Sequence, residues 1–269
     1  MLFRSIDIPE GKIFGLLGPN GAGKSTLIRI INRITMATDG EVWFNGRPIT
    51  DDDVAHIGYL PEERGLYRKM RVGDQAMYLA QLRGMSSRDA ARELKAWFVR
   101  FGIQDWWNKK VEELSKGMAQ KVQFITTVVH KPSLMILDEP FSGFDPVNAD
   151  LIRKEILRLK EEGATIILST HNMESVEELC DEIALINKAR LVVTGGTDDI
   201  RHRFGEDNVE IEYTEDFVRQ TEVLGREKAP ARLTELIEGG IRINAYRELV
   251  PRMNDIFIKL VTESEGEGK

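Results

Sequence analysis

GPNGAGKST, at residues 18–26, decides the fold of this chain, because it fits the pattern G-x-x-x-x-G-K-[ST]. An apolar run at residues 12–17 precedes it and stops at a glycine. Apolar residues then recur at helical spacing over residues 25–34. The sequence therefore predicts a strand, a glycine-rich loop and a helix, which is the local context that this pattern needs for binding phosphate.

The residues of this loop suit a triphosphate and a divalent cation. Glycines let backbone N–H groups turn inward as an anion-binding nest, and the start of the following helix adds partial positive charge. In such a loop Lys24 bridges the terminal phosphates, and the Ser25 hydroxyl supplies a ligand to Mg2+. We expect the whole loop to bind ATP: Gly18, Pro19, Asn20, Gly21, Ala22, Gly23, Lys24, Ser25 and Thr26.

A second polar group follows the apolar run LMIL at residues 134–137. Asp138 and Glu139 come directly after this predicted strand, at the carboxyl edge where parallel sheets bind ligands. We expect Asp138 to bind Mg2+ and Glu139 to orient the water that attacks the γ-phosphate. His171 follows the apolar run 165–169 at the same edge, where a ring nitrogen can contact the γ-phosphate. Taken alone, such acids can simply cap a helix, and such a histidine can be incidental.

The chain between these motifs changes character. Short apolar runs at residues 41–44 and 56–60, separated by the turn residues NGRPI, predict strands in an antiparallel flank. Three helical patterns follow, at residues 73–83, 87–101 and 116–130. They predict a helical subdomain inserted at about residues 72–130. Its tryptophans and neighbouring aromatic residues belong mostly to its core, although a groove for a helix of a membrane partner is the alternative.

The alternation of strands and helices then resumes. The two apolar runs named above flank a helical pattern at residues 147–162, which predicts a buried parallel sheet. Beyond the glycines at 195–196, a short charged helix is followed by a strand, helices, a second strand and a last helix. We interpret this as two domains, one at residues 1–204 and a small C-terminal one at residues 205–269.

Composition and charge narrow the class of protein. Of 269 residues, 42% are hydrophobic, so a packed core is expected. The 37 basic and 44 acidic residues give a net charge of -7, which argues against nucleic acid as the main partner. We find no apolar run of membrane-spanning length and no signal-peptide pattern, and the single cysteine, Cys180, suits a reducing compartment. These features predict a cytoplasmic protein.

The order of the motifs resembles that of the ATP-binding cassette family, over roughly residues 1–200. The phosphate loop is followed by LSKGM at residues 114–118, LMILDEP at 134–140, SGFD at 142–145 and STH at 169–171. The resemblance implies an α/β P-loop NTPase cassette with a mixed sheet core, an antiparallel β flank and an inserted helical subdomain. The C-terminal domain is then a small α+β addition to this cassette.

The resemblance also implies the ATP-hydrolysing subunit of a transporter. It is closest to ATPases of the sodium-extrusion and drug-resistance exporters, in which a cassette chain pairs with a separate integral membrane permease. In that family two cassettes, identical or different, sandwich two Mg-ATP molecules. Ser115 and Gly117 are then expected to contact the γ-phosphate held by the partner cassette, and Asp145 to cross between the two sites. The chain is expected at the inner face of the cell membrane, attached through its permease.

Three departures from the family pattern stand out. Glu62 occupies the position of a glutamine that usually reaches Mg2+ and the attacking water, and a carboxylate can also bind the cation. Lys116 and Met118 replace two residues of the usual LSGGQ segment. Phe3 is too near to Gly18 in the sequence to supply the aromatic residue on which the family stacks adenine. Two alternatives stay open: a soluble cassette ATPase that acts on DNA or ribosomes, and a regulatory cassette that binds ATP without hydrolysing it.

Overall fold

The computed structural model describes residues 5–63, 65–205 and 207–266, and Phe3 lies outside them. The chain divides into two compact units, Met1–Thr194 and Gly195–Lys269. The division places the helix after Gly196 with the second unit, whereas the sequence analysis placed residues up to 204 with the first. Within the described ranges, no helix is long and apolar enough to cross a membrane.

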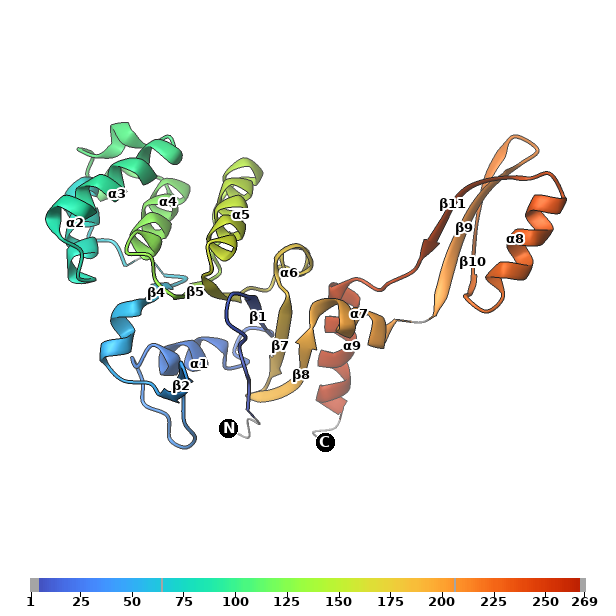
Figure 1. The fold of residues 1–269 in the computed structure, drawn as a ribbon, viewed down its shortest axis with the longest axis horizontal. Helices are drawn as coiled ribbons and strands as arrows, with labels where there is room; N and C mark the ends of the chain where they lie inside the picture. The colour runs from blue at the N-terminus through green and yellow to red at the C-terminus, as the bar shows by residue number, and fades with distance from the viewer. Residues whose placement is uncertain (1–4, 64, 206, 267–269) are drawn as a thin grey trace. The chain divides into compact units, whose positions relative to one another are not determined.

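The first unit is built on a six-stranded sheet. Its strands are β1 (Ile13–Leu17), β4 (Ile57–Leu60), β5 (Leu134–Asp138), β6 (Thr165–Ser169), β7 (Glu182–Asn187) and β8 (Arg190–Gly196). They lie in the order β4-β5-β6-β1-β7-β8, and the neighbouring pairs from β4 to β7 are parallel (Figure 1). Every residue of β1, β5 and β6 is buried, as expected of continuous apolar runs in a parallel sheet. The loops that follow β1, β4, β5 and β6 therefore meet at one edge.

The predicted antiparallel flank is correct only in part. β2 (Trp43–Phe44) and β3 (Arg47–Pro48) pair antiparallel, but β4 pairs parallel with β5 in the central sheet. A 3-10 helix, η1 (Asp52–His56), leads from the flank into β4. Three of the four residues of β4 are buried, so this strand is a continuous buried run and not an alternating one. The placement of residues 56–60 in the flank is therefore wrong.

Helices cover the sheet and form the inserted subdomain. They are α1 (Lys24–Ile31), α2 (Val72–Leu82), α3 (Ser87–Arg100), α4 (Lys116–Val128), α5 (Pro146–Glu161) and α6 (Met173–Leu179), with the 3-10 helices η2 (Gln104–Trp106) and η3 (Val111–Glu113). α2, α3 and α4 pack against one another at one end of the first unit, which confirms the three predicted helical patterns (Figure 1). α3 begins where the side chain of Ser86 accepts a hydrogen bond from the backbone N–H of Asp89.

The aromatic residues of the helical subdomain belong to its core. Trp97 is 8% exposed and Phe98 is 1% exposed. The rings of Phe98 and Trp107 lie 5.2 Å apart in an edge-to-face arrangement. The indole of Trp107 also covers Gly73, where a Cβ would lie 2.3 Å from the ring. A cavity of about 410 Å³ borders the subdomain, and none of these residues lines it.

The second unit, described by itself, is an α+β arrangement. It contains α7 (Thr197–Phe204), β9 (Asn208–Glu215), β10 (Val218–Gly225), α8 (Ala229–Glu238), β11 (Arg242–Glu248) and α9 (Met253–Gly266). The strands form an antiparallel sheet in the order β10-β9-β11, and Leu236 of α8 packs on Ile211 and Tyr213 of β9. The sequence analysis expected only helices between the two strands of this domain, but residues 218–225 form β10, because a tight turn at Asp216 and Phe217, both with positive φ, returns the chain along β9.

Candidate active site

The phosphate loop joins β1 to α1. Three of its glycines have positive φ angles: Gly18 (151°), Gly21 (78°) and Gly23 (108°). At Gly18 a Cβ would lie 2.1 Å from the carbonyl oxygen of Ile186 in β7, so only glycine lets the loop pass this close to the neighbouring strand. A backbone hydrogen bond of 3.1 Å from Ala22 to Pro19 closes the turn. The glycine pattern therefore fixes a narrow loop at the carboxyl edge of the sheet.

The start of α1 is left without a side-chain cap. Gly23 stands at the N-cap position, and no described side chain accepts a hydrogen bond there. The first N–H groups of a helix have no partner within the helix, and Ser25 and Thr26 are exposed at this point. Asn20 and Gly21 of the loop are exposed as well. The helix start thus offers backbone donors and partial positive charge to an anion.

Lys24 folds back over the loop. Its Nζ donates to the carbonyl oxygens of the first two loop residues, at 2.6 Å and 3.2 Å. Burial lowers the pKa of Lys24, and the negative charges of Glu139, Asp138 and Glu62 oppose this shift. These carboxylates therefore lie within electrostatic reach of the Lys24 ammonium, although they come from the loop after β4, the end of β5 and the loop after β5. The fold gathers four residues at one edge from three separate parts of the sequence.

Asp138 ends β5 and is 5% exposed. Its partner in the register of β6 is Ser169. Burial raises the pKa of Asp138, the charges of Glu62 and Glu139 raise it further, and Lys24 lowers it. Three acids beside one lysine leave net negative charge at this edge, which a divalent cation would neutralise. Carboxylate oxygens are also the ligands that Mg2+ prefers, so the site fits this ion.

Glu139 combines a strained backbone with a shared carboxylate. Its φ of 48° lies in the left-handed region that residues other than glycine rarely adopt. One carboxylate oxygen accepts a hydrogen bond from the backbone N–H of His171 (3.0 Å) and lies 2.7 Å from its ring Nδ1, which donates because an ionised carboxylate only accepts. Thr170 Oγ1 donates to the other oxygen at 3.3 Å. The sequence analysis missed Thr170, although its place between Ser169 and His171 in STH was a usable signal.

Ser115 and Gly117 lie at the start of α4. Ser115 is exposed and is the N-cap residue, and its hydroxyl accepts a hydrogen bond from the backbone N–H of Met118 (3.3 Å). A Cβ at Gly117 would lie 3.4 Å from the carbonyl oxygen of Gly143 and 3.6 Å from the ring of Phe144. The start of α4 therefore packs beside the loop that follows β5.

Asp145 caps α5 in that same loop. Its carboxylate accepts hydrogen bonds of 3.0 Å from the backbone N–H groups of Val147 and Asn148, and the Asn148 side chain donates to it as well. The hydrogen bond from the Asn148 backbone is the largest cause that holds the pKa of Asp145 below its ordinary value. Its charge also acts on Lys121 of α4, where it opposes the lowering of the pKa by burial. The predicted residues thus fall into two groups, one around Lys24 and one around Ser115.

The fold and the first of these groups define a class of protein, a P-loop nucleoside triphosphatase. A glycine loop between a buried parallel strand and a helix, with an aspartate at the end of a nearby strand, is the arrangement of that class. The family described as ABC transporter matches residues 4–142, and the chain belongs to this family. It is one of the family's ATP-binding subunits, which are ATPases.

Relatives and solved structures agree with this assignment. The ABC transporter ATP-binding protein YhaQ of Bacillus subtilis is 44% identical over 272 residues, which cover 95% of this chain and 91% of YhaQ. The linearmycin resistance ATP-binding protein LnrL of Bacillus subtilis is 32% identical over 208 residues, 76% of this chain and 67% of LnrL. A solved structure of the ATP-binding subunit of an ABC transporter has a TM-score of 0.69 and 31% identity, over 74% of this chain and 85% of that one. The similarity to YhaQ therefore extends well into the second unit.

Proposed function

We propose that this chain hydrolyses Mg-ATP as one of two cassettes in a dimer, and thereby powers export through a separate integral membrane permease. The observation that carries the proposal is the convergence of Lys24, Glu62, Asp138 and Glu139 at one edge of the parallel sheet. A phosphate loop alone supports nucleotide binding. The carboxylates beside it supply the two further requirements of hydrolysis, a metal site and a group that orients water.

The oxygen donors beside the loop suit a metal bound together with the nucleotide. We assign the Ser25 hydroxyl and the carboxylates of Asp138 and Glu62 to Mg2+. This ion usually takes one or two protein carboxylates and completes its shell with phosphate oxygens and water. Among the described residues, no group of three or more His, Cys, Asp or Glu could hold a metal ion by itself. When bound, Mg2+ neutralises charge on the β- and γ-phosphates, while Lys24 exchanges its two carbonyl partners for phosphate oxygens.

Glu139 is the residue that we assign to the attacking water. Its carboxylate accepts hydrogen bonds from Thr170 and His171. An ionised carboxylate has about four acceptor sites, so one is left for a water molecule. The His171 side chain is 72% exposed, which leaves it free to turn from Glu139 towards a γ-phosphate oxygen. Glu139 would then orient the water and accept its proton as the water oxygen bonds to the γ-phosphorus and the bond from that phosphorus to the leaving oxygen of ADP breaks. The strained backbone at Glu139 supports an active-site role.

The second group of residues supports a dimer. Ser115 is exposed and Gly117 lies beside residues 143–144, so the start of α4 is available to a second molecule. We propose that a hydroxyl and backbone N–H groups at the start of α4 contact the γ-phosphate held by the partner cassette, and that Asp145 lies at the boundary between the two sites. The partner is a second copy of this chain or a related cassette.

The export role rests on the family and on its relatives. LnrL is named for linearmycin resistance, which supports export as the direction of transport. We propose that the chain lies at the inner face of the cell membrane, attached through a permease whose own residues select the cargo. With a net charge of -7 the chain has no general attraction for a polyanion, so we propose no nucleic acid partner.

Steady-state ATP hydrolysis by the purified chain, alone and co-expressed with the membrane protein encoded beside it, tests this proposal. Glu139→Gln should lower turnover by roughly 10²- to 10⁴-fold and keep ATP binding, because the amide fits the same space but is not a base. Glu161→Gln, at the exposed end of α5, is the matched control and should keep wild-type turnover. Wild-type protein that binds ATP but never hydrolyses it would favour the regulatory cassette. Hydrolysis without any complex or stimulation would favour the soluble one.

A further inference from the structure

We infer that Gln123 of α4 is a positioning residue for Glu62. Its side-chain amide holds the backbone on both sides of Glu62, and thereby sets where that carboxylate lies in the metal site. The inference rests on the metal role of Glu62 proposed above, and it adds to that site a buried residue that the sequence motifs do not include.

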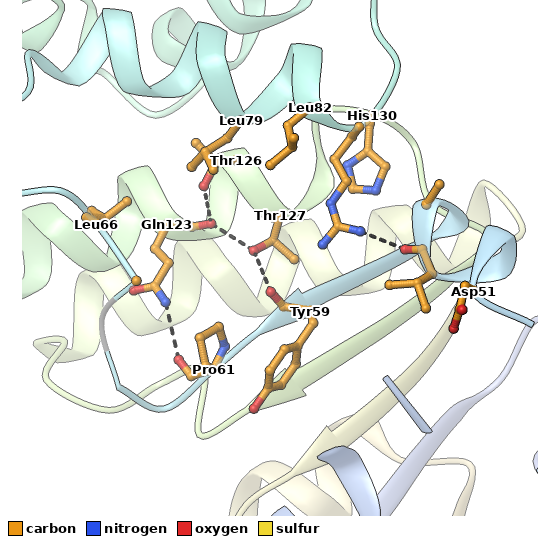
Figure 2. A pocket seen from close by; sticks show the side chains of 14 residues that line it. Asp51, Tyr59, Pro61, Leu66, Leu79, Leu82, Gln123, Thr126, Thr127 and His130 are labelled. Carbon is orange, nitrogen blue, oxygen red and sulfur yellow. Dashed lines mark hydrogen bonds between the residues drawn. The ribbon is translucent and has the colours of Figure 1, made fainter. Parts of the chain in front are cut away.

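The first step is the close packing of α4 on β4. A Cβ at Gly58 would lie 2.7 Å from the carbonyl oxygen of Thr127 and 2.8 Å from the ring of Pro132, so this approach needs a glycine in the strand. Thr127 Oγ1 also reaches the carbonyl oxygen of Tyr59 at 3.5 Å (Figure 2). The helix is therefore fixed along the strand that leads into the loop of Glu62.

The second step is the contact between Gln123 and that loop. Gln123 lies one helical turn before Thr127, so both project from the same side of α4. Its Nε2 donates to the carbonyl oxygen of Pro61 (3.3 Å), as Figure 2 shows, and to that of Glu63 (3.4 Å). Both partners are acceptors, so the amide nitrogen with its two hydrogens must face them. The two carbonyl groups belong to the residues immediately before and after Glu62.

The third step is that, among the described residues, no other hydrogen bond holds residues 61–63. Glu62 is exposed, so packing of its own side chain does not hold it. A cavity of about 410 Å³, lined by Pro61, Leu66 and Gln123 among others, leaves the loop without packing on that side (Figure 2). Gln123 is 4% exposed, so its amide is held inside the protein and does not exchange these partners freely with water. The position of the loop therefore depends on the hydrogen bonds from Gln123.

The fourth step is the sensitivity of the site to the position of Glu62. The Glu62 carboxylate lies within electrostatic reach of both Asp138 and Lys24. Coulomb interactions fall with distance, so a shift of the loop changes the charge balance in which a cation binds. Residues that orient a metal ligand without touching the metal commonly change affinity or activity by roughly 10- to 100-fold when they are substituted.

The test is the Mg2+ dependence of ATP hydrolysis by the full chain. Gln123→Met keeps the length of the side chain but removes the donor, and should raise the half-saturating Mg2+ concentration by roughly 10-fold. Binding of ATP without metal should stay at the wild-type value. Gln120→Met is the matched control, because Gln120 is equally buried on the same helix and no hydrogen bond among the described residues joins it to residues 61–63. Gln123→Asn, which draws the amide back by one methylene, replaces Gln123→Met if that variant does not fold.

A double-mutant cycle with Glu62→Ala separates positioning from a general structural effect. The effect of Gln123→Met should vanish in the Glu62→Ala background, because no carboxylate is left to position. An equal effect in both backgrounds would overturn the inference, as would a wild-type Mg2+ dependence in Gln123→Met. In either of these two outcomes, a shift of the Mg2+ dependence by Glu62→Ala alone would mean that the metal role of Glu62 stands and that only the positioning role of Gln123 fails. If Glu62→Ala changes nothing, the proposed metal role of Glu62 fails and takes the inference with it.

Discussion

α1 and α4 both begin with a lysine at the end of a loop, yet the two helices differ in how the backbone N–H groups of their first turn find hydrogen-bond partners. Lys24 follows Gly23, which provides no side-chain cap, and its ammonium lies within electrostatic reach of three carboxylates. Lys116 follows Ser115, whose hydroxyl caps α4, and its stem lies against Gly143, where a Cβ would come within 2.6 Å of it. The first helix start is incomplete without a ligand, whereas the second is complete within the chain.

The aspartates of the two regions differ in the same way. Burial raises the pKa of Asp138, so its ionised form is costly until a cation is present. Hydrogen bonds from the start of α5 lower the pKa of Asp145, so its ionised form is stabilised by the chain itself. The comparison suggests that the phosphate loop region depends on nucleotide and metal for its charge balance. The region around Ser115 is complete within the chain.

Substitution of the two lysines tests the difference between the two helix starts most directly. Lys24→Ala should lower kcat/KM for ATP by roughly 10²- to 10⁴-fold, because two charge-assisted hydrogen bonds to phosphate are lost. Lys116→Ala, also at a helix start, should keep ATP binding by the isolated chain. Binding by fluorescence titration and turnover by phosphate release measure the two effects. Equal losses in both variants would show that the two helix starts do not differ as proposed.

Sequence alone located the elements around the phosphate loop because their signals are local. The continuous apolar runs became the fully buried strands β1, β5 and β6, and the helical patterns became α2, α3 and α4. Periodicity reports how a segment is buried but not which strand it pairs with. For this reason β4 was assigned to the wrong sheet. β10 was missed because its residues, 218–225, are mostly exposed, have no alternating pattern and form a strand by pairing with β9.

The site was predictable to the extent that its residues follow strands. The motif order placed Lys24, Asp138 and Glu139 at one edge, because parallel strands all end there. The hydrogen bonds of Thr170 to Glu139 and of Gln123 to the loop of Glu62 were not predictable. Each joins residues that are far apart in the sequence, and a buried threonine or glutamine carries no periodic signal of the partner that it will find.

Substitutions at Ser115 separate helix capping from phosphate contact, because the two roles have different chemical requirements. Ser115→Asp keeps a good N-cap and should keep the wild-type melting temperature, but its charge should repel a partner's γ-phosphate and lower turnover by roughly 10- to 100-fold. Ser115→Ala should destabilise the chain by about 0.5 to 1 kcal/mol.

The control for Ser115 is Ser86→Ala, which removes the cap of α3 far from any nucleotide contact proposed here. Ser86→Ala should lower the free energy of unfolding by a similar amount and should keep the wild-type turnover. Thermal melting measures the first effect and ATP hydrolysis the second. Full activity in Ser115→Asp would mean that the start of α4 meets no phosphate, and the two regions would then differ only in how they are capped.

The smallest effect is expected at Asp145, whose contribution to the stability of the chain depends on pH. Asp145→Asn keeps an oxygen that accepts from the N–H groups of Val147 and Asn148, but removes the negative charge at the start of α5. The pKa of Asp145 is lowered in the folded chain, so its charge contributes stability above the ordinary pKa of an aspartate. That contribution is lost as the pH falls through the lowered pKa.

Melting temperatures of wild type and Asp145→Asn should therefore differ slightly at pH 7 and converge on acidification. The difference should also shrink in high salt, because Asp145 is exposed and its charge is screened. A difference that is independent of both pH and salt would mean that Asp145 acts through hydrogen-bond geometry alone. The charge of Asp145 would then not stabilise the start of α5, and the proposed electrostatic difference between Asp145 and Asp138 would be wrong.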